Sequence, residues 1–254
     1  DGCHLTSLAE VTTWMATKCE DEGAEVYTEF AGHQLLYDGD KVIGVRLGDT
    51  GLQHNGTPGS SYTPGMDVFA KITVLGEGSY GSLTQELIKK HNLDNESNPQ
   101  VYATGIKEIV KIPAGRVKKG EVIHTFGYPL AKSNYGGSFI YGYEEDLIGI
   151  GLVIGLDYVD PHLKFHQAFL KFKKHPMISK IIEGGEVVEY GAKTLPEGGF
   201  YSIPKLAVDG AVIVGDGCGM LNAMRLKGVH LAMKSGMLAA EKICEALANG
   251  IFSS

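Results

Sequence analysis

The chain has 254 residues, of which 43% are hydrophobic and 21% are charged, a composition typical of a folded globular protein and not of a disordered or collagen-like chain. Its formal net charge of −7 provides no basic surface for a nucleic-acid backbone, so we expect no nucleic-acid partner. The four cysteines are widely spaced and form no C-x-x-C pair, which predicts unpaired thiols in a reducing compartment and neither a zinc nor an iron–sulfur site.

The N-terminal region is predicted to begin with an amphipathic helix. Apolar residues recur at helical spacing from Leu5 to Cys19, and Ser7 with Glu10 forms a capping-box pattern at its start. A short strand is expected over residues 24–27, after Gly23.

A β-hairpin is predicted next, because two apolar runs flank a turn with a central glycine. His33–Tyr37 and Lys41–Leu47 form its strands, and Asp38-Gly39-Asp40 forms its turn. Residues 48–66 are rich in Gly, Ser, Thr and Pro, which predicts a loop.

A predicted strand, Phe69–Leu75, then enters a glycine turn that is followed by a helix. Gly76-x-Gly78-x-x-Gly81 in this turn matches the dinucleotide-binding fingerprint. That motif requires an acidic residue at the end of a second strand about 20 positions on, whereas residues 94–99 read as a loop. Three interpretations stay open: a direct dinucleotide site, a turn that only packs a helix on a sheet, and a turn that approaches a nucleotide from a strand returning to the sheet.

The middle of the chain, from about 101 to 190, is predicted to form a sheet with limited helical cover. Leu147–Leu156 is the longest apolar run, but glycines interrupt it and it is shorter than the roughly 18 residues that span a bilayer, so we predict a buried strand. One helical stretch is expected, and its apolar face is Leu163, Phe165, Phe169 and Phe172.

A last strand, Ala211–Val214, is predicted to enter the turn Gly215–Gly219, with a long helix beginning shortly after Gly228. In this turn Asp216 can accept hydrogen bonds from sugar or ribityl hydroxyls at the carboxyl edge of the sheet, or it can only cap the turn. The positive end of the helix can face an anionic group such as a reduced flavin.

Other catalytic signatures are absent from the sequence. The nine histidines show no metal-ligand spacing, and neither a G-x-S-x-G elbow nor an H-E-x-x-H helix is present, so hydrolase chemistry has no support. The chain begins at Asp1 with no methionine and no targeting segment, and we therefore expect a processed or partial chain.

From Tyr135-Gly136-Gly137-Ser138-Phe139 onward, the sequence resembles the electron transfer flavoprotein-ubiquinone oxidoreductase family. The run from Leu226 to Glu241 is the longest and most specific match. Shorter matching segments cover nearly the whole chain in the family's order: Trp14-Met15, Gly78 with Gly81-Ser82-Leu83, Gly155-Leu156-Asp157-Tyr158, Glu183-Gly184-Gly185, Tyr190-Gly191-Ala192, Glu197-Gly198-Gly199 and Ser202–Leu206.

The resemblance implies an α/β fold with an α+β insert. Residues 1–100 would be part of a glutathione-reductase-type FAD-binding domain, 101–205 an inserted and mostly antiparallel quinone-binding sheet, and 206–254 the last strand and helix of the FAD-binding domain. The family's ADP-binding βαβ unit would precede Asp1, and its segment with the cluster cysteines would follow the last helix.

The resemblance further implies an oxidoreductase that passes electrons from electron transfer flavoprotein, through a 4Fe-4S cluster and FAD, to ubiquinone. The cluster would have no ligands in this chain. Membrane contact would be peripheral or monotopic, at the matrix side of the mitochondrial inner membrane or the cytoplasmic side of a bacterial plasma membrane, and this chain alone would be soluble.

Site residues follow from the same resemblance, and none is a nucleophile or general base, because the protein positions two redox rings. Tyr135, Gly136 and Gly137 would border the quinone, where backbone amides can donate to a carbonyl and an aromatic ring can pack on the quinone face. The FAD contacts would be Gly78 and Gly81 near the nucleotide, Gly215, Asp216 and Gly217 along the ribityl and pyrophosphate groups, and Asn222, Gly228 and Val229 near the isoalloxazine ring.

Two alternatives stay open. The sequence of the turn Gly215–Gly219 departs from the glycine-cysteine-serine-proline motif that is usual in the family. It is similar to the aspartate-containing motif of geranylgeranyl-reductase-type flavoproteins, which act on polyprenyl lipids. The other alternative is a flavin-free binding module for a redox partner or lipid.

Overall fold

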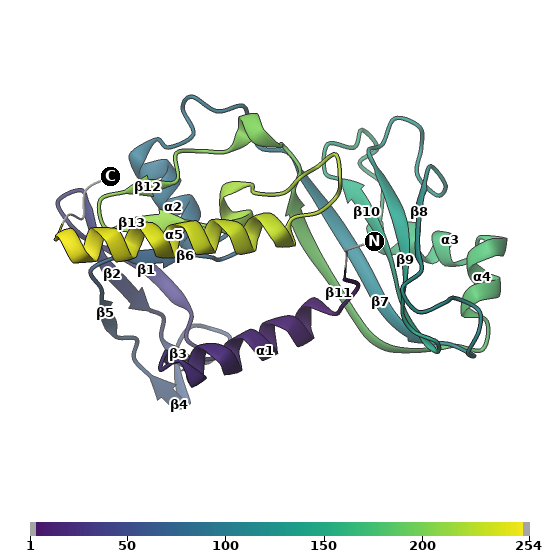
Figure 1. Cartoon of the computed structure of the whole chain (residues 1–254), viewed down its shortest axis with the longest axis horizontal. Coiled ribbons are helices and arrows are strands. Elements are labelled where there is room, and N and C mark those ends of the chain that lie inside the picture. Colours follow the sequence, from purple (N-terminus) through teal and green to yellow (C-terminus); the bar gives the residue numbers. More distant parts are fainter. Residues whose placement is uncertain (1–3, 251–254) are drawn as a thin grey trace. The chain divides into compact units, whose positions relative to one another are not determined.

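The computed structural model describes residues 4–250 of the chain (Figure 1). They divide into two compact units, the first made of Asp1–Val26 with Val101–Leu195 and the second of Tyr27–Gln100 with Pro196–Ser254. Both units combine helices with strands that are mostly antiparallel, so the expected mixed α/β class is confirmed.

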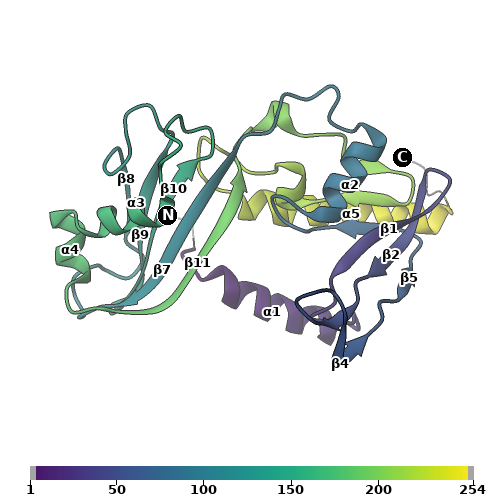
Figure 2. The same cartoon turned by 180° about the vertical axis from the view of Figure 1, so that it is seen from behind.

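The first unit is built on a five-stranded sheet with the order β11-β7-β10-β9-β8. Figure 2 shows the long strands β7 and β11 side by side at one edge. The predicted buried strand is confirmed as the central strand β10, which pairs antiparallel with β7 and β9. The strands are β7 (Tyr102–Lys111), β8 (Val122–Phe126), β9 (Gly136–Glu144), β10 (Leu147–Gly155) and β11 (Glu186–Pro196).

Two helices cover one face of this sheet. The predicted helix is α3 (Phe165–Lys173), whose Phe169 and Phe172 are fully buried against alternate residues of β10 such as Ile150. A second helix, α4 (Pro176–Ile182), follows it and was not predicted. Because strand side chains alternate between faces, the other face of the sheet carries a different set of residues.

Helix α1 (Leu8–Asp21) confirms the predicted N-terminal helix, but two details of that prediction are wrong. Ser7 makes no side-chain capping hydrogen bond, and none of the helix's side chains is buried. The strand expected over residues 24–27 is also absent, since this segment is irregular.

The second unit begins with the predicted hairpin, β1 (Gly32–Asp38) and β2 (Lys41–Leu47), which pair antiparallel. The loop expected over residues 48–66 is wrong, because it contains a further hairpin of β3 (Thr50–Leu52) and β4 (Pro58–Thr63).

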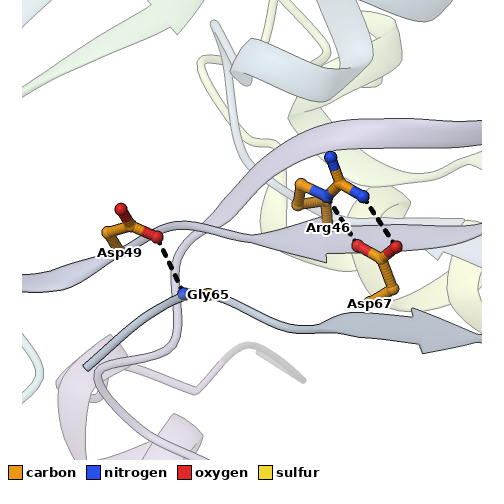
Figure 3. Close-up of polar contacts among 4 residues, drawn as sticks. All are labelled: Arg46, Asp49, Gly65 and Asp67. Carbon is orange, nitrogen blue, oxygen red and sulfur yellow. Dashed lines mark hydrogen bonds and ion pairs between the residues drawn. The ribbon is translucent and has the colours of Figure 1, made fainter.

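Polar contacts close the base of this second hairpin (Figure 3). Arg46 donates two hydrogen bonds to the Asp67 carboxylate, at 2.6 and 2.7 Å, and the amide of Gly65 donates to Asp49 at 2.8 Å. A Cβ on Gly65 would lie 1.9 Å from the Leu47 carbonyl oxygen, so only glycine fits where the chain returns.

A three-stranded sheet with the order β12-β13-β6 completes the second unit. The strand expected over 69–75 is instead two strands, because β5 (Asp67–Phe69) pairs with β2 whereas β6 (Thr73–Leu75) joins β13 (Ala211–Ile213). The remaining elements are β12 (Ala207–Val208), the helices α2 (Ser82–His91) and α5 (Val229–Asn249), and the 3-10 turns η1 (Phe200–Ser202) and η2 (Gly215–Cys218).

Candidate functional site

The structure brings the two glycine turns of the second unit together. Strands β6 and β13 pair in parallel, so the segments that follow them leave the same edge of the sheet. A Cβ placed on Gly217 would lie 3.4 Å from the carbonyl oxygen of Gly78. Gly78 itself has a φ of +84°, and nothing described lies within 4 Å of its Cβ position. The carboxyl edge of a parallel pair, lined by glycines, is where open α/β sheets bind nucleotides.

The first turn carries its own anion at the start of α2. The Glu77 carboxylate accepts hydrogen bonds from the amides of Leu83 (3.2 Å) and Thr84 (2.6 Å) and from the Thr84 hydroxyl (2.7 Å). A Cβ on Gly81 would lie 2.3 Å from the Glu77 Cβ, so the position of the capping Glu77 is sufficient reason for a glycine at 81. A pyrophosphate at this helix end would have to displace Glu77, so the geometry disfavours the direct dinucleotide interpretation.

The second turn is fixed to α5 by a buried hydroxyl. Gly215, at a φ of +66°, donates its amide to Ser235 Oγ at 2.9 Å, and that hydroxyl donates to the Ala232 carbonyl at 2.7 Å. The Cys218 thiol donates to the Gly215 carbonyl at 3.0 Å, and burial raises its pKa to about 11. The Gly215 amide is thus engaged inside the protein.

Asp216 is a partly buried carboxylate without a hydrogen-bond donor among residues 4–250. Burial raises its pKa above the ordinary aspartate value. Its Oδ1 lies 3.3 Å from the Cβ position of Gly228, which precedes α5. The side chain therefore does not cap the turn, and it can accept hydrogen bonds from hydroxyls that the described chain does not supply.

Helix α5 differs from α2 at its start, because no side chain caps it, whereas Glu77 accepts hydrogen bonds from the first amides of α2. Like α2, it has no acidic residue in its first turn. Asn222 shapes the loop before it: its side-chain oxygen accepts from the Arg225 amide at 3.1 Å, and its backbone pairs with Lys227. Val229, the first residue of α5, is 49% exposed. The expected FAD residues therefore gather within one unit, around one sheet edge and one helix start.

The expected quinone residues lie in the first unit, at the start of β9. Gly136 and Gly137 fit closely between strands: their Cβ atoms would lie 2.3 Å from the Val153 carbonyl oxygen and 2.5 Å from the Thr125 carbonyl oxygen, respectively. Tyr135 lies 3.3 Å from the Cβ position of Gly155. Strand packing is thus sufficient reason for both glycines at 136 and 137.

An aromatic cluster follows these residues on β9 and was missed by sequence reasoning. Phe139 stacks on Tyr141 with ring centroids 4.7 Å apart, and the Tyr141 hydroxyl lies 3.0 Å from His124 Nε2 on β8. Lys107 donates to the Tyr143 hydroxyl at 3.3 Å. The alternation of aromatic residues at 139, 141 and 143 is a period-two signal that places them on one face. We call Phe139, Tyr141, Tyr143 and His124 the aromatic face.

Glycines of β10 lie beneath this aromatic face, on the side of the sheet opposite α3. A Cβ on Gly149 would lie 2.7 Å from the Tyr143 ring, and one on Gly151 would lie 2.3 Å from the Phe139 ring. A pocket of about 300 Å³ lies at the edge of the sheet that β7 and β11 form, and the residues that line it include Gly105 and Lys107. Among residues 4–250, no helix is both long and apolar enough to cross a bilayer.

The fold identifies a class of protein. A geranylgeranyl bacteriochlorophyll reductase-like structure from Thermoplasma acidophilum has a TM-score of 0.74 at 16% identity, covering 96% of this chain and 55% of that one. The myxobacterial halogenase CndH, a variant of the FAD-dependent halogenases, has a TM-score of 0.66 at 17% identity, covering 97% and 53%. The chain therefore shares its fold with these two structures, the second of which is an FAD-dependent halogenase.

Sequence comparison narrows the class. Residues 102–195 match the family model described as ETF-QO, ubiquinone-binding. Electron transfer flavoprotein-ubiquinone oxidoreductases are 43% identical in Oryza sativa subsp. japonica (98% of this chain, 44% of the relative), 43% in Pseudomonas aeruginosa (98% and 46%) and 41% in Homo sapiens (95% and 40%). The chain is a relative of electron transfer flavoprotein-ubiquinone oxidoreductase, which confirms the predicted resemblance. It spans less than half the length of these relatives.

Proposed function

We propose that this chain provides the quinone-binding sheet and part of the flavin-binding domain of an oxidoreductase that passes electrons from electron transfer flavoprotein, through FAD, to ubiquinone. One observation carries the proposal. The segment 102–195, which matches the ubiquinone-binding model, coincides with the five strands of the first unit and their two covering helices. The three relatives reported above align along nearly the whole chain and are named for this reaction.

The domain assignment is part of this proposal. We assign residues 101–205 to the quinone-binding sheet domain and 1–100 with 206–254 to a glutathione-reductase-type FAD-binding domain. The compact units of the structure differ from these bounds at two places, because Asp1–Val26 falls in the unit of the sheet and 196–205 falls in the other unit. The parallel pair β6–β13 with a glycine turn at each carboxyl end supports the second assignment, because such an edge accommodates a nucleotide. The likeness to FAD-dependent enzymes supports it through the fold.

The described residues fit FAD at three points. Gly78 leaves space along the sheet edge, Asp216 offers a carboxylate that lacks donors, and Gly228 with Val229 begins a helix without a cap. We assign the carboxylate to ribityl or ribose hydroxyls and the helix start to the negative side of the flavin ring. Bound FAD would supply two-electron acceptance and release, while these residues bind and orient it.

The quinone, partner and location assignments are also proposals. Tyr135, Gly136 and Gly137 border the quinone, and electron transfer flavoprotein is the electron donor. The matched domain, which contains these three residues, supports a quinone site in this unit, and the relatives' names support the electron donor. A 4Fe-4S cluster, where present, is held outside this chain. We place the protein at the mitochondrial inner membrane or a bacterial plasma membrane, in peripheral or monotopic contact.

The test is a visible absorption spectrum of the purified 254-residue chain after FAD is added and the excess removed. We expect retained flavin bands that weaken in Asp216→Asn but not in Asp40→Asn, a matched change in the exposed β1–β2 turn. A colourless wild-type chain would support the flavin-free module. In flavin-loaded protein, reduction of a polyprenyl double bond in place of ubiquinone would support the geranylgeranyl-reductase alternative.

A further inference from the structure

The second glycine turn is held at both ends by buried contacts, whereas the side chain in its middle has no donor. Gly215, its first residue, donates its amide to Ser235 Oγ at 2.9 Å. Gly219, its last residue, closes the turn by donating its amide to the Asp216 carbonyl at 3.0 Å. The Asp216 carboxylate between them accepts no hydrogen bond within residues 4–250. Its position therefore depends on what fixes the two ends of the turn.

Ser235 fixes the first end of the turn. This residue is only 8% exposed, and its hydroxyl both accepts from the Gly215 amide and donates to the Ala232 carbonyl at 2.7 Å. A Cβ on Gly215 would lie 3.4 Å from the Ala232 Cβ, so the turn also packs on this part of α5. One hydroxyl thus ties the turn to the helix whose start we assign to the flavin ring.

Gln100 lies against the other end of the turn. A Cβ on Gly219 would lie 2.5 Å from Gln100 Nε2, so the carboxamide occupies the space where a side chain at 219 would lie. Gly219 has a φ of +78°, a conformation that favours glycine, and it has no side chain of its own to hold it there. The carboxamide is itself anchored, because its oxygen accepts from the Gly198 amide at 2.7 Å.

The backbone that carries Gln100 is also fixed within the second unit. Ser202, which is 5% exposed, donates its hydroxyl to the Pro99 carbonyl at 3.1 Å. The amide of Asn98 donates to the Tyr201 carbonyl at 2.7 Å. A side chain that starts from a fixed backbone and is hydrogen-bonded at its end can hold its neighbour in one place.

We propose that Gln100 and Ser235 are positioning residues, which hold the turn so that the Asp216 carboxylate is oriented for the hydroxyls of FAD before FAD binds. This inference rests on the proposed function, because it concerns the same flavin site. A turn that is ordered in advance loses little conformational freedom when the ligand binds, and this raises affinity without a new contact to the ligand. Both residues act through the turn, Ser235 at Gly215 and Gln100 at Gly219.

The first test measures the Kd of FAD for the 254-residue chain by titration of flavin fluorescence. Gln100→Met keeps the length of the side chain but cannot accept from Gly198, and Ser235→Ala leaves the Gly215 amide without its acceptor. We expect each change to raise the Kd about 3- to 10-fold, the equivalent of one hydrogen bond. Gln167→Met, at an exposed glutamine of α3, is the matched control and should leave the Kd unchanged.

Dependence on Asp216 separates positioning from a general loss of stability. In a chain that also carries Asp216→Asn, Gln100→Met and Ser235→Ala should each raise the Kd less than about twofold, because the carboxylate that they position is gone. Equal fold-changes with and without Asp216→Asn, or a Kd that neither variant changes, would overturn the inference and leave the proposed function standing. A wild-type chain that binds no FAD would overturn the proposed flavin site and the inference with it.

A second measurement needs no flavin. Amide hydrogen exchange in the FAD-free chain reports how often the turn opens, and the Gly219 amide is the bond that closes it. This amide should exchange about 3- to 10-fold faster in Gln100→Met than in Gln167→Met, while the amides of α2 exchange equally in both. Equal exchange of the Gly219 amide in the two variants, or the same acceleration in α2, would overturn the positioning role of Gln100.

Discussion

Removal of the Glu77 carboxylate should destabilise α2 without improving nucleotide binding. In Glu77→Ala, the start of the helix loses two amide bonds and one hydroxyl bond, at 3.2, 2.6 and 2.7 Å. Loss of a helix cap costs about 1–2 kcal/mol and loss of a negative charge at this end about 0.3–1 kcal/mol. The fully buried Thr84 would keep an unpaired hydroxyl, which adds about 1 kcal/mol. We expect a total of about 2–4 kcal/mol.

Two measurements check this value. Hydrogen exchange at residues 82–91 reports the local free energy of opening, and equilibrium urea denaturation reports the stability of the chain. Glu96→Ala is the control, because its ion pair with Lys205 is long (3.8 Å) and exposed, and should cost less than about 0.5 kcal/mol. Equal effects of the two variants would refute the capping role. Tighter FAD binding by Glu77→Ala would show that the start of α2 is a phosphate site after all.

Three further outcomes are expected. Gly137→Ala should lower the free energy of unfolding by about 1–3 kcal/mol, because its Cβ would lie 2.5 Å from the Thr125 carbonyl, and an unfolding midpoint equal to wild type would contradict this. Burial raises the pKa of Asp216, so the stability that its neutral form contributes is present at low pH and is lost as the pH rises through that pKa. In urea titrations, Asp216→Asn should therefore stabilise the flavin-free chain at pH 7 but not near pH 3. The same variant should weaken FAD binding about tenfold. Lys173→Met should lower the free energy of unfolding by about 2–3 kcal/mol, because it leaves Glu108, only 12% exposed, without the partner that lies 2.5 Å away. The double variant Lys173→Met with Glu108→Leu should recover at least half of this loss in the same denaturation assay.

Hydrophobic periodicity predicted the elements that carry the core. The run Leu147–Leu156 became β10, whose consecutive residues are mostly buried, and the apolar face around Phe169 became α3, because burial decides both patterns. The hairpin around Gly39 was also predictable, since its turn chemistry is local.

Elements that depend on tertiary contacts were not predictable from local patterns. The sequence of the hairpin β3–β4 is polar and therefore indicates a loop. The hairpin is closed by the contacts Asp49–Gly65 and Arg46–Asp67, and the two residues of each contact are far apart in sequence. Residues 24–27 have strand-like composition but pair with no strand within the part of the chain that the structure describes. Helix α4 did carry a local signal, because Pro176 occupies its first turn, a position that proline favours.

The site shows the same division. That each glycine turn joins a strand to a helical segment follows from the sequence, but their contact through Gly78 and Gly217 requires the parallel pairing of β6 with β13. Glu77 was overlooked because the dinucleotide-binding fingerprint, Gly76-x-Gly78-x-x-Gly81, accepts any residue at position 77. An acidic residue shortly before a helix is a usable signal, since carboxylates are favoured near the positive end.

Burial of Cys218 gives the second glycine turn chemical inertness. A thiol with a pKa of about 11 is ionised in only about one molecule in 10⁴ at pH 7, and the thiolate is the form that attacks electrophiles and peroxides. Cys19 and Cys244 are exposed and would react first with oxidants from solvent. If FAD binds at this turn as proposed, a reactive sulfur beside it would form adducts as the cofactor cycles between oxidised and reduced states, whereas this turn keeps its sulfur as a small, protonated packing group.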